Sequence, residues 1–373
     1  FSPAPVDHID FTFDRPIDQQ SFSLADDVVR FTGPNGNILA AGFSWLDSRT
    51  LQVTFAAQSV LGLYELVLGP NIRDIGGNLL DQSGNGVAGE IPIDRYSATF
   101  TLADIFFVSG NIAQNTTWGG LVIVDDNVTV QSGVTLAINP GTIVKLRDHT
   151  SVHVQSGATL LSNGTVAQPV RITSIHDDNV GGDSDENGDR IAPQPGDWIS
   201  LQIDNGTARL ESTYVLYGGG SVSGVWNQSG MLRTTGNATL DISRSSLGHA
   251  LFDGILTQGG TTTITNSVVS GADRGIVSWG FAGAQVQVAN STIVKNGTGL
   301  LGHGGTLSVV NSVISNNLQF GIDNDIDPDP TVRFSDIFTP GGANTRGFAD
   351  PLGSNGNVSV DPKFKNAPAG NYR

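Results

Sequence analysis

Apolar and polar residues alternate in several short segments of the first hundred residues. Clear examples are residues 9–13 (IDFTF), 51–55 (LQVTF) and 64–68 (YELVL), where apolar side chains occupy every second position. This period of two is typical of β-strands that bury one face. Clusters of Gly, Pro, Asn and Ser separate the segments and indicate turns. The pattern predicts a β-sandwich in residues 1–102, without helices.

The sequence pattern changes near residue 106, where the sequence begins to repeat about every 22 residues. Three copies share an Asn-Ser pair, and the Asn spacings are 290 − 266 = 24 and 311 − 290 = 21. A Gly followed by an aliphatic residue recurs in register at positions 254, 275, 299 and 321. No copy has the 3.6-residue period of a helix. The repeats therefore predict a right-handed parallel β-helix with loop insertions, in which coils stack about 4.8 Å apart.

This repeat sets expectations for length and for bonding between coils. At about 22 residues per coil, residues 106–338 hold roughly ten coils and form a rod about 48 Å long. Asn266, Asn290 and Asn311 occupy equivalent places in three copies. We expect them to stack at one bend and to form an asparagine ladder between coils.

Both parts of the chain resemble known families. Residues 10–18 (DFTFDRPID) and 69–74 (GPNIRD) resemble the bacterial Ig-like domain of S-layer and other surface proteins, and this resemblance implies a spacer or interaction module. Residues 128–136, 138–145 and 152–164 resemble the opening coils of pectate-lyase-like surface proteins. We therefore expect two all-β domains, an Ig-like β-sandwich over 1–102 and a β-helix over 106–373. We also expect the chain to be a fragment of a larger modular protein.

Composition narrows the classes of partner. The chain has 19 basic and 35 acidic residues, a net charge of −16 and no cysteine. With so few cations it has no basic patch for nucleic acid, and the absence of cysteine excludes disulfides, Cys-ligated zinc and thiol catalysis. No apolar run approaches the roughly 20 residues of a membrane span, so direct membrane insertion is not expected. Metal cations are the better partners, and we expect an extracellular or cell-surface protein.

An acidic loop at residues 177–189 (DDNVGGDSDENGD) carries the sharpest candidate site. Its second half matches the beginning of a calcium-binding loop, in which oxygen ligands occupy alternate positions. The twelfth position of that motif holds Gln194 instead of Glu, so the last carboxylate must come from Asp177, Asp178 or Asp197. We predict a calcium site. Its ligands would come from Asp177, Asp178, Asp183, Asp185, Asn187 and Asp189.

A second loop repeats this logic in the N-terminal domain. Asp81, Ser83 and Asn85 place oxygen atoms at alternate positions, and Glu90 follows, then Asp94. Calcium is a candidate ligand here too, although an ordinary turn explains the same residues. A further acidic run at 323–329 is either a calcium site or a solvated loop.

The sequence favours a calcium-stabilised, non-catalytic module that acts as scaffold or adhesin, with a polysaccharide or other surface proteins as partners. No catalytic or organic-cofactor residue is assigned. One alternative is a calcium-dependent polysaccharide lyase or a glycosidase, in which Arg274 or Arg333 lies beside a metal–carboxylate cluster. Another is a carbohydrate-binding rod with at least two of Trp118, Trp198, Trp226 and Trp279 exposed in line, although packing is the favoured role for Trp118 and Trp198.

Overall fold

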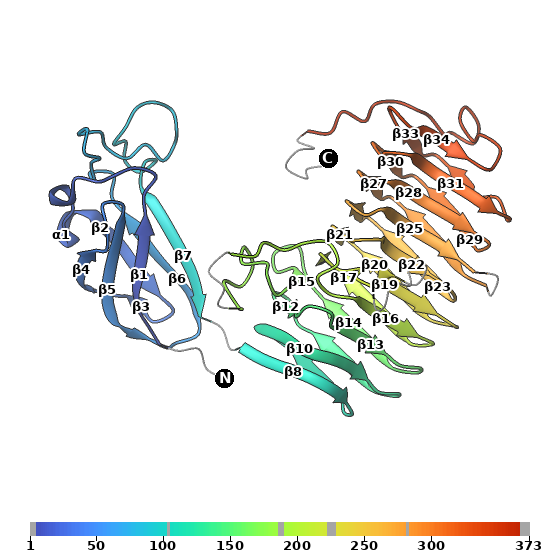
Figure 1. Cartoon of the computed structure of the whole chain (residues 1–373), viewed down its shortest axis with the longest axis horizontal. Coiled ribbons are helices and arrows are strands. Elements are labelled where there is room, and N and C mark those ends of the chain that lie inside the picture. Colours follow the sequence, from blue (N-terminus) through green and yellow to red (C-terminus); the bar gives the residue numbers. More distant parts are fainter. Residues whose placement is uncertain (1–4, 103–104, 186–189, 222–228, 281–282, 366–373) are drawn as a thin grey trace. The chain divides into compact units, whose positions relative to one another are not determined.

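The computed structural model describes residues 5–102, 105–185, 190–221, 229–280 and 283–365. The chain divides into two compact units, Phe1–Ile105 and Phe106–Arg373. Figure 1 shows both units. No described helix has the length and apolar character needed to span a bilayer.

The N-terminal unit contains two antiparallel sheets. One sheet has the order β1-β5-β4 and the other has the order β3-β2-β6-β7. The strands are β1 (Val6–Thr12), β2 (Val28–Gly33), β3 (Gly36–Asn37), β4 (Ala40–Trp45), β5 (Thr50–Gln58), β6 (Gly62–Leu68) and β7 (Tyr96–Leu102). The three alternating segments of the sequence lie in or extend from β1, β5 and β6.

The two sheets share one hydrophobic core. Phe11 of β1, Val53 of β5 and Leu66 of β6 are all buried in it, as the period-two pattern requires. The expectation of no helix was wrong for one turn, because α1 (Leu24–Asp27) follows η1 (Gln19–Ser21) and is capped by the Ser23 side chain. The Ig-like identity of this unit stays a prediction from the sequence.

The second unit is a parallel β-helix with three faces, and each coil contributes one strand to each face (Figure 1). The first face contains β10 (Leu121–Val130), β12 (Ile143–Leu146), β15 (Val170–Ser174), β18 (Thr213–Leu216), β21 (Ser246–Gly248), β24 (Val268–Ser270), β27 (Thr292–Val294), β30 (Val313–Ser315) and β33 (Asp336–Phe338). The second face contains the end of β10, then β13 (Ser151–Val154), β16 (Ser200–Asp204), β19 (Gly230–Thr235), β22 (Asp253–Thr257), β25 (Arg274–Trp279), β28 (Thr298–His303), β31 (Phe320–Ile326) and β34 (Ala343–Arg346).

The third face completes each coil. It contains β9 (Thr116–Trp118), β11 (Thr135–Ile138), β14 (Thr159–Asn163), β17 (Thr207–Glu211), β20 (Thr239–Ser243), β23 (Thr261–Thr265), β26 (Gln285–Ala289), β29 (Thr306–Val310) and β32 (Thr331–Arg333). β8 (Ile105–Ile112) precedes the first coil. Alternate residues of all three faces point inward and form one continuous core along the rod.

The predicted period of about 22 residues is found in the first coil step, where Val122 aligns with Val144, and again in the last coils. On the first face the register aligns Leu247, Val269, Ile293, Ile314 and Ile337, with spacings of 22, 24, 21 and 23. The middle coils are longer, because the same row runs through Val144, Ile172 and Val215 with spacings of 28 and 43. The extra residues form loops between strands, including residues 175–199 between β15 and β16.

A buried ladder of serines joins successive coils. The backbone N–H of Ser267 donates to Ser291 Oγ, and that of Ser291 donates to Ser312 Oγ, both at 3.2 Å. Each of these hydroxyls in turn donates to the carbonyl two residues before it in the chain. The same pattern includes Ser245 and Ser335. The backbone N–H groups of these five serines therefore all have acceptors, as buried amides require.

The expected asparagine ladder is therefore replaced by the serine that follows each Asn. Asn266, Asn290 and Asn311 have φ angles of 50°, 52° and 48°, a left-handed conformation that Asn tolerates better than most residues. One side-chain bond links Asn311 to Asn290. A buried asparagine ladder exists at another bend, where the N–H of Ala272 donates to Asn296 and that of Asn296 donates to Asn317.

Candidate functional site

The acidic loop lies against the outward side of the first face. One outward-pointing row of this face consists of Ile123, Lys145 and Thr173, which follow the inward-pointing residues of their strands. An outward row would normally be exposed to solvent, yet none of these three side chains is more than 1% exposed. Described residues of the loop that follows β15 contact this row, because Asp177 bonds to Thr173 and Gly182 bonds to Lys145. A side chain at Gly181 would place its Cβ 3.3 Å from Leu121, so the loop backbone packs closely on the strand.

Three carboxylates of the loop converge above the buried lysine. Oxygen atoms of Asp178, Asp183 and Asp185 all lie within 4.8 Å of one another. Lys145 Nζ donates to the Gly182 carbonyl at 2.5 Å and lies 3.9 Å from Asp178 Oδ1. Burial lowers the pKa of Lys145, while the carboxylates, Asp178 foremost, oppose that change. The chain thus supplies one cationic group to its own acidic loop.

His176 supplies a second cationic group to the acidic loop. Its Nδ1 lies 2.5 Å from Asp185 Oδ2, and its Nε2 lies 3.0 Å from Asp148 Oδ1. Burial disfavours the charged imidazole, but the hydrogen bonds to Asp185 and Asp148 prevail and raise the pKa of His176. From the sequence His176 was given no role, and the only signal for one was its position directly before Asp177.

The remaining predicted ligands of this loop are not part of the three-carboxylate group. Asp177 is buried and accepts a hydrogen bond from the Thr173 hydroxyl at 2.7 Å. Asp197 accepts from the Ser174 hydroxyl and from the backbone N–H of Gln194. Asn187 and Asp189 lie outside the described residues. Asp178, Asp183 and Asp185 are the predicted ligands that come together.

The second acidic loop is organised by internal hydrogen bonds. Asp94 is inaccessible to solvent and accepts from the backbone N–H groups of Ser83 and Glu90 at 3.1 and 2.8 Å. Burial opposes its ionisation, but these hydrogen bonds lower the pKa of Asp94. The predicted ligands also pair with one another, because Ser83 donates to Asp81 and Asn85 donates to Glu90. These hydrogen bonds within the loop are those of an ordered turn, the alternative to a calcium site that the sequence left open.

A second apolar cluster lies on the outward side of the second face. It consists of Leu256, Val277 and Leu301, which are neighbours in register on β22, β25 and β28, and Trp279 packs against it. The Trp279 ring stacks on the His303 ring, with centroids 3.9 Å apart. His303 Nδ1 in turn lies 2.7 Å from Asp325 Oδ1. The outer surface here is therefore aromatic and polar, beside the apolar cluster.

Charged pairs flank this cluster. Arg274 lies 5.8 Å from the centroid of the Trp279 ring and forms an ion pair with Asp253. Burial raises the pKa of Asp253 to about 7, although the Arg274 charge opposes it. In the next coils Arg346 pairs with Asp323 and covers the Phe320 ring at 4.0 Å.

Polar side chains continue along the same outward side toward the start of the rod. His153 Nε2 lies 2.6 Å from Asp204 Oδ2, and Gln202 donates to the same oxygen at 2.9 Å. Arg233 donates to Gln258 at 2.8 Å. We call the outward set on the second face the polar strip. Its members are His153, Gln202, Asp204, Arg233, Gln258, Trp279, His303 and Asp325.

The structure also bears on the predicted tryptophans and arginines. Trp118 and Trp198 are buried, at 5% and 0% exposure, as expected for packing residues. Trp226 lies outside the described residues. Arg274 contacts Asp253 rather than the Asp178, Asp183 and Asp185 group, which is the one three-carboxylate group found in the described part of the chain.

Comparisons with known proteins give only distant likenesses. No family model and no curated protein matches the chain. Among solved structures, the periplasmic alginate epimerase AlgG is 8% identical, with 68% of this chain and 76% of that chain covered and a TM-score of 0.30. The catalytic unit of a GH87 α-1,3-glucanase from Streptomyces thermodiastaticus is 12% identical, with 95% and 88% covered and a TM-score of 0.26. The A-module of the Azotobacter vinelandii mannuronan C-5 epimerase AlgE6 is 12% identical, with 67% and 92% covered and a TM-score of 0.18. At these scores no activity is inferred from them.

Proposed function

We propose that the β-helix binds an extended polysaccharide along the polar strip. The observation that carries the proposal is the register of the strip. It aligns His153, Gln202 and Arg233 in one row across successive coils, and it aligns Trp279 with His303 in the neighbouring outward row. The strip runs from β13 to β31, six coil steps of about 4.8 Å, or roughly 29 Å. Each step is close to the length of one sugar unit in an extended chain.

The chemistry of the strip supports a carbohydrate ligand. Trp279, backed by the apolar cluster and stacked on His303, offers an aromatic surface for the apolar face of a sugar ring. Carboxylate, amide and imidazole groups on either side both donate and accept hydrogen bonds. Asp253 is inaccessible and engaged by Arg274, so we assign it no catalytic role.

Binding is tested by affinity electrophoresis of the full chain against soluble neutral and anionic polysaccharides. We expect at least one polysaccharide to retard the protein, and Trp279→Ala to reduce that retardation at least tenfold. Tyr214→Ala is the matched control, because Tyr214 is a half-exposed aromatic with an arginine above it on a different face. Equal retardation of wild type and Trp279→Ala would overturn the proposal, as would no retardation by any polymer. Assays for released sugar ends in the same mixtures distinguish binding from turnover.

We also propose that Ca²⁺ stabilises the acidic loop. The support is the convergence of Asp178, Asp183 and Asp185, whose oxygens suit a hard cation. Calorimetric titration of the chelator-stripped protein should show binding that Asp183→Ala/Asp185→Ala loses. Asp125→Ala/Asp126→Ala removes the same charge elsewhere and should bind normally. No heat at millimolar Ca²⁺ would refute the site.

These proposals place the chain in an exported protein of the bacterial surface or extracellular space. A rod held together by coil-to-coil contacts would act there as a scaffold or adhesin that holds surface polysaccharide.

A further inference from the structure

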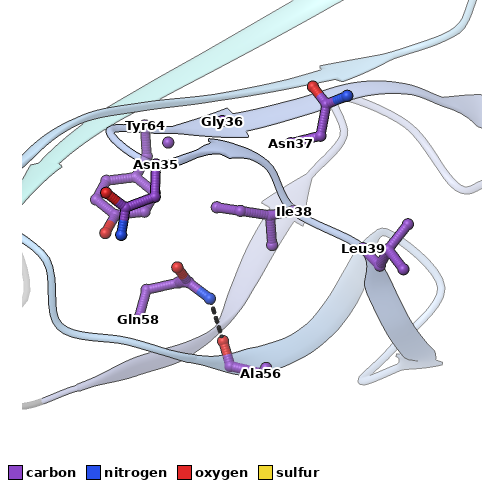
Figure 2. A pocket seen from close by; sticks show the side chains of 9 residues that line it. Asn35, Gly36, Asn37, Ile38, Leu39, Ala56, Gln58 and Tyr64 are labelled. Atoms are coloured by element: carbon purple, nitrogen blue, oxygen red, sulfur yellow. Dashed lines mark hydrogen bonds between the residues drawn. The ribbon is translucent and has the colours of Figure 1, made fainter.

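The N-terminal unit contains a cavity that neither loop prediction used. It has a volume of about 290 Å³ and lies where the β2–β3 hairpin meets the end of β5 and residues before β4. Figure 2 shows Asn35, Ile38 and Gln58 around this space, whereas the side chain of Leu39 points away from it. The remaining lining residues are Gly33, Gly36, Asn37, Ala56 and Tyr64.

The lining has a distinct chemical character. None of its nine residues carries a charged side chain, in a protein whose net charge is −16. Three of them, Asn35, Asn37 and Gln58, are amides, which both donate and accept hydrogen bonds. Gln58 Nε2 donates to the Ala56 carbonyl at 2.6 Å, which holds that amide in place (Figure 2). Such a lining suits an uncharged ligand rich in hydroxyl groups.

The geometry of Tyr64 argues against a flat aromatic ligand. Its ring is fully buried and stacks on Phe100, with centroids 4.8 Å apart and planes 9° apart. The hairpin approaches the ring closely, because a Cβ at Gly33 would lie 2.6 Å from its Cε1. Its hydroxyl donates to the Val60 carbonyl. Tyr64 therefore serves as a wall of the cavity and not as a stacking platform.

We propose that this cavity binds a single neutral sugar residue. Its volume of about 290 Å³ is just below the range for ligand sites, roughly 300–1,000 Å³, which limits the ligand to about one ring. Amide hydrogen bonds would recognise the hydroxyls, and Ile38 would contact the apolar part of the ring. The inference is independent of polysaccharide binding on the β-helix, because all lining residues belong to the N-terminal unit.

The test is saturation-transfer NMR on the full chain with glucose, galactose, mannose and xylose, and with glucuronate as the charged comparison. We expect transfer to at least one neutral sugar with a dissociation constant on the order of 1 mM. Gln58→Ala should weaken it at least fivefold. Ala56→Trp, a substitution at an exposed lining position, should fill the cavity and abolish the transfer. Gln20→Ala changes an exposed amide outside the cavity and should have no effect.

Several outcomes would overturn the inference. These are no transfer to any neutral sugar at tens of millimolar, undiminished transfer in folded Ala56→Trp protein, or equal transfer to glucuronate. Thermal melts of each variant establish that it is folded, and Gln58→Ala alone serves if Ala56→Trp does not fold. Trp279→Ala should retain this binding, so failure on the β-helix and failure in this cavity are told apart.

Discussion

Arg274 holds the carboxylate of Asp253 through two hydrogen bonds, from Nε at 2.5 Å and from Nη2 at 3.0 Å. The two residues are 21 positions apart in sequence and face each other in register on adjacent coils. Asp253 has no exposed surface, and its burial raises its pKa to about 7. Arg274 also lies near the Trp279 ring. The pair therefore links the interior of the second face to its outward aromatic cluster.

Asp253 should make stability depend on pH. Its pKa of about 7 in the folded protein is above the unfolded value of 3.8, so the folded state binds more protons between these values. Stability is therefore lost as the pH rises from about 4 to about 7, by roughly 2–4 kcal/mol. Urea unfolding across this range should show the loss in wild type and a much flatter profile in Asp253→Asn. A wild-type profile as flat as that of the variant would contradict the assignment.

The serine ladder should contribute measurably to stability. Ser291→Ala removes the acceptor for the Ser267 N–H and leaves that buried donor unpaired. We expect the free energy of unfolding to fall by about 1–3 kcal/mol. Ser308→Ala, at a half-buried position on β29, is the control and should change it by less than about 0.5 kcal/mol. Equal effects of the two substitutions in denaturant melts would show that the ladder does not contribute.

His176 should make the acidic loop most stable in mild acid. Its pKa is raised in the folded protein, so its contribution is complete below its ordinary pKa of about 6.5 and is lost as the pH rises through the folded value. Amide hydrogen exchange in residues 177–185, corrected for intrinsic rates, should show less protection at pH 8.5 than at pH 6. His176→Asn should remove this difference. Protection that increases with pH would be incompatible with the assignment.

Lys145 should be a stabilising cation beneath the loop. Lys145→Met leaves the Asp178 carboxylate without its buried partner charge, and we expect a loss of roughly 3 kcal/mol in metal-free buffer. The same variant should bind Ca²⁺ more tightly than wild type, because a repelling charge is removed. Lys295→Met makes this substitution at an exposed lysine and should change neither quantity. Calorimetry and thermal melts on both variants test the two effects.

The sequence predicted the strands better than the bends. Residues 51–55 alternate because one side of β5 is buried, and this constraint is visible in any window of five residues. The period of the β-helix was clearest after residue 240, because loops lengthen the middle coils without disturbing their stacking and so interrupt the repeat. The ladder was assigned to Asn290 rather than to Ser291, since both recur together. Only the backbone geometry separates the residue that turns the chain from the residue that bonds the coils.

The candidate sites show the same contrast between features that are local in sequence and features that depend on the fold. Asp183 and Asp185 were found because they are close in sequence. Lys145 escaped notice as their partner, since it reaches the loop through folding. His176 belongs to the loop itself, but only the fold brings Asp185 and Asp148 to its ring. Trp279 and His303 were not paired from the sequence alone, yet each lies four residues after a repeated glycine, Gly275 and Gly299. Aligning the copies on that glycine would have placed the two rings on adjacent coils.

The serine ladder restricts how the length of this protein can change. Because each coil bonds only to the coils before and after it, removing the interval from Ser291 to Ser312 would bring equivalent partners together again. Removing a single residue from a strand would instead turn its inward side chains outward. The β-helix can therefore gain or lose whole coils without disturbing the remaining coils. Its length is adjustable in steps of one coil.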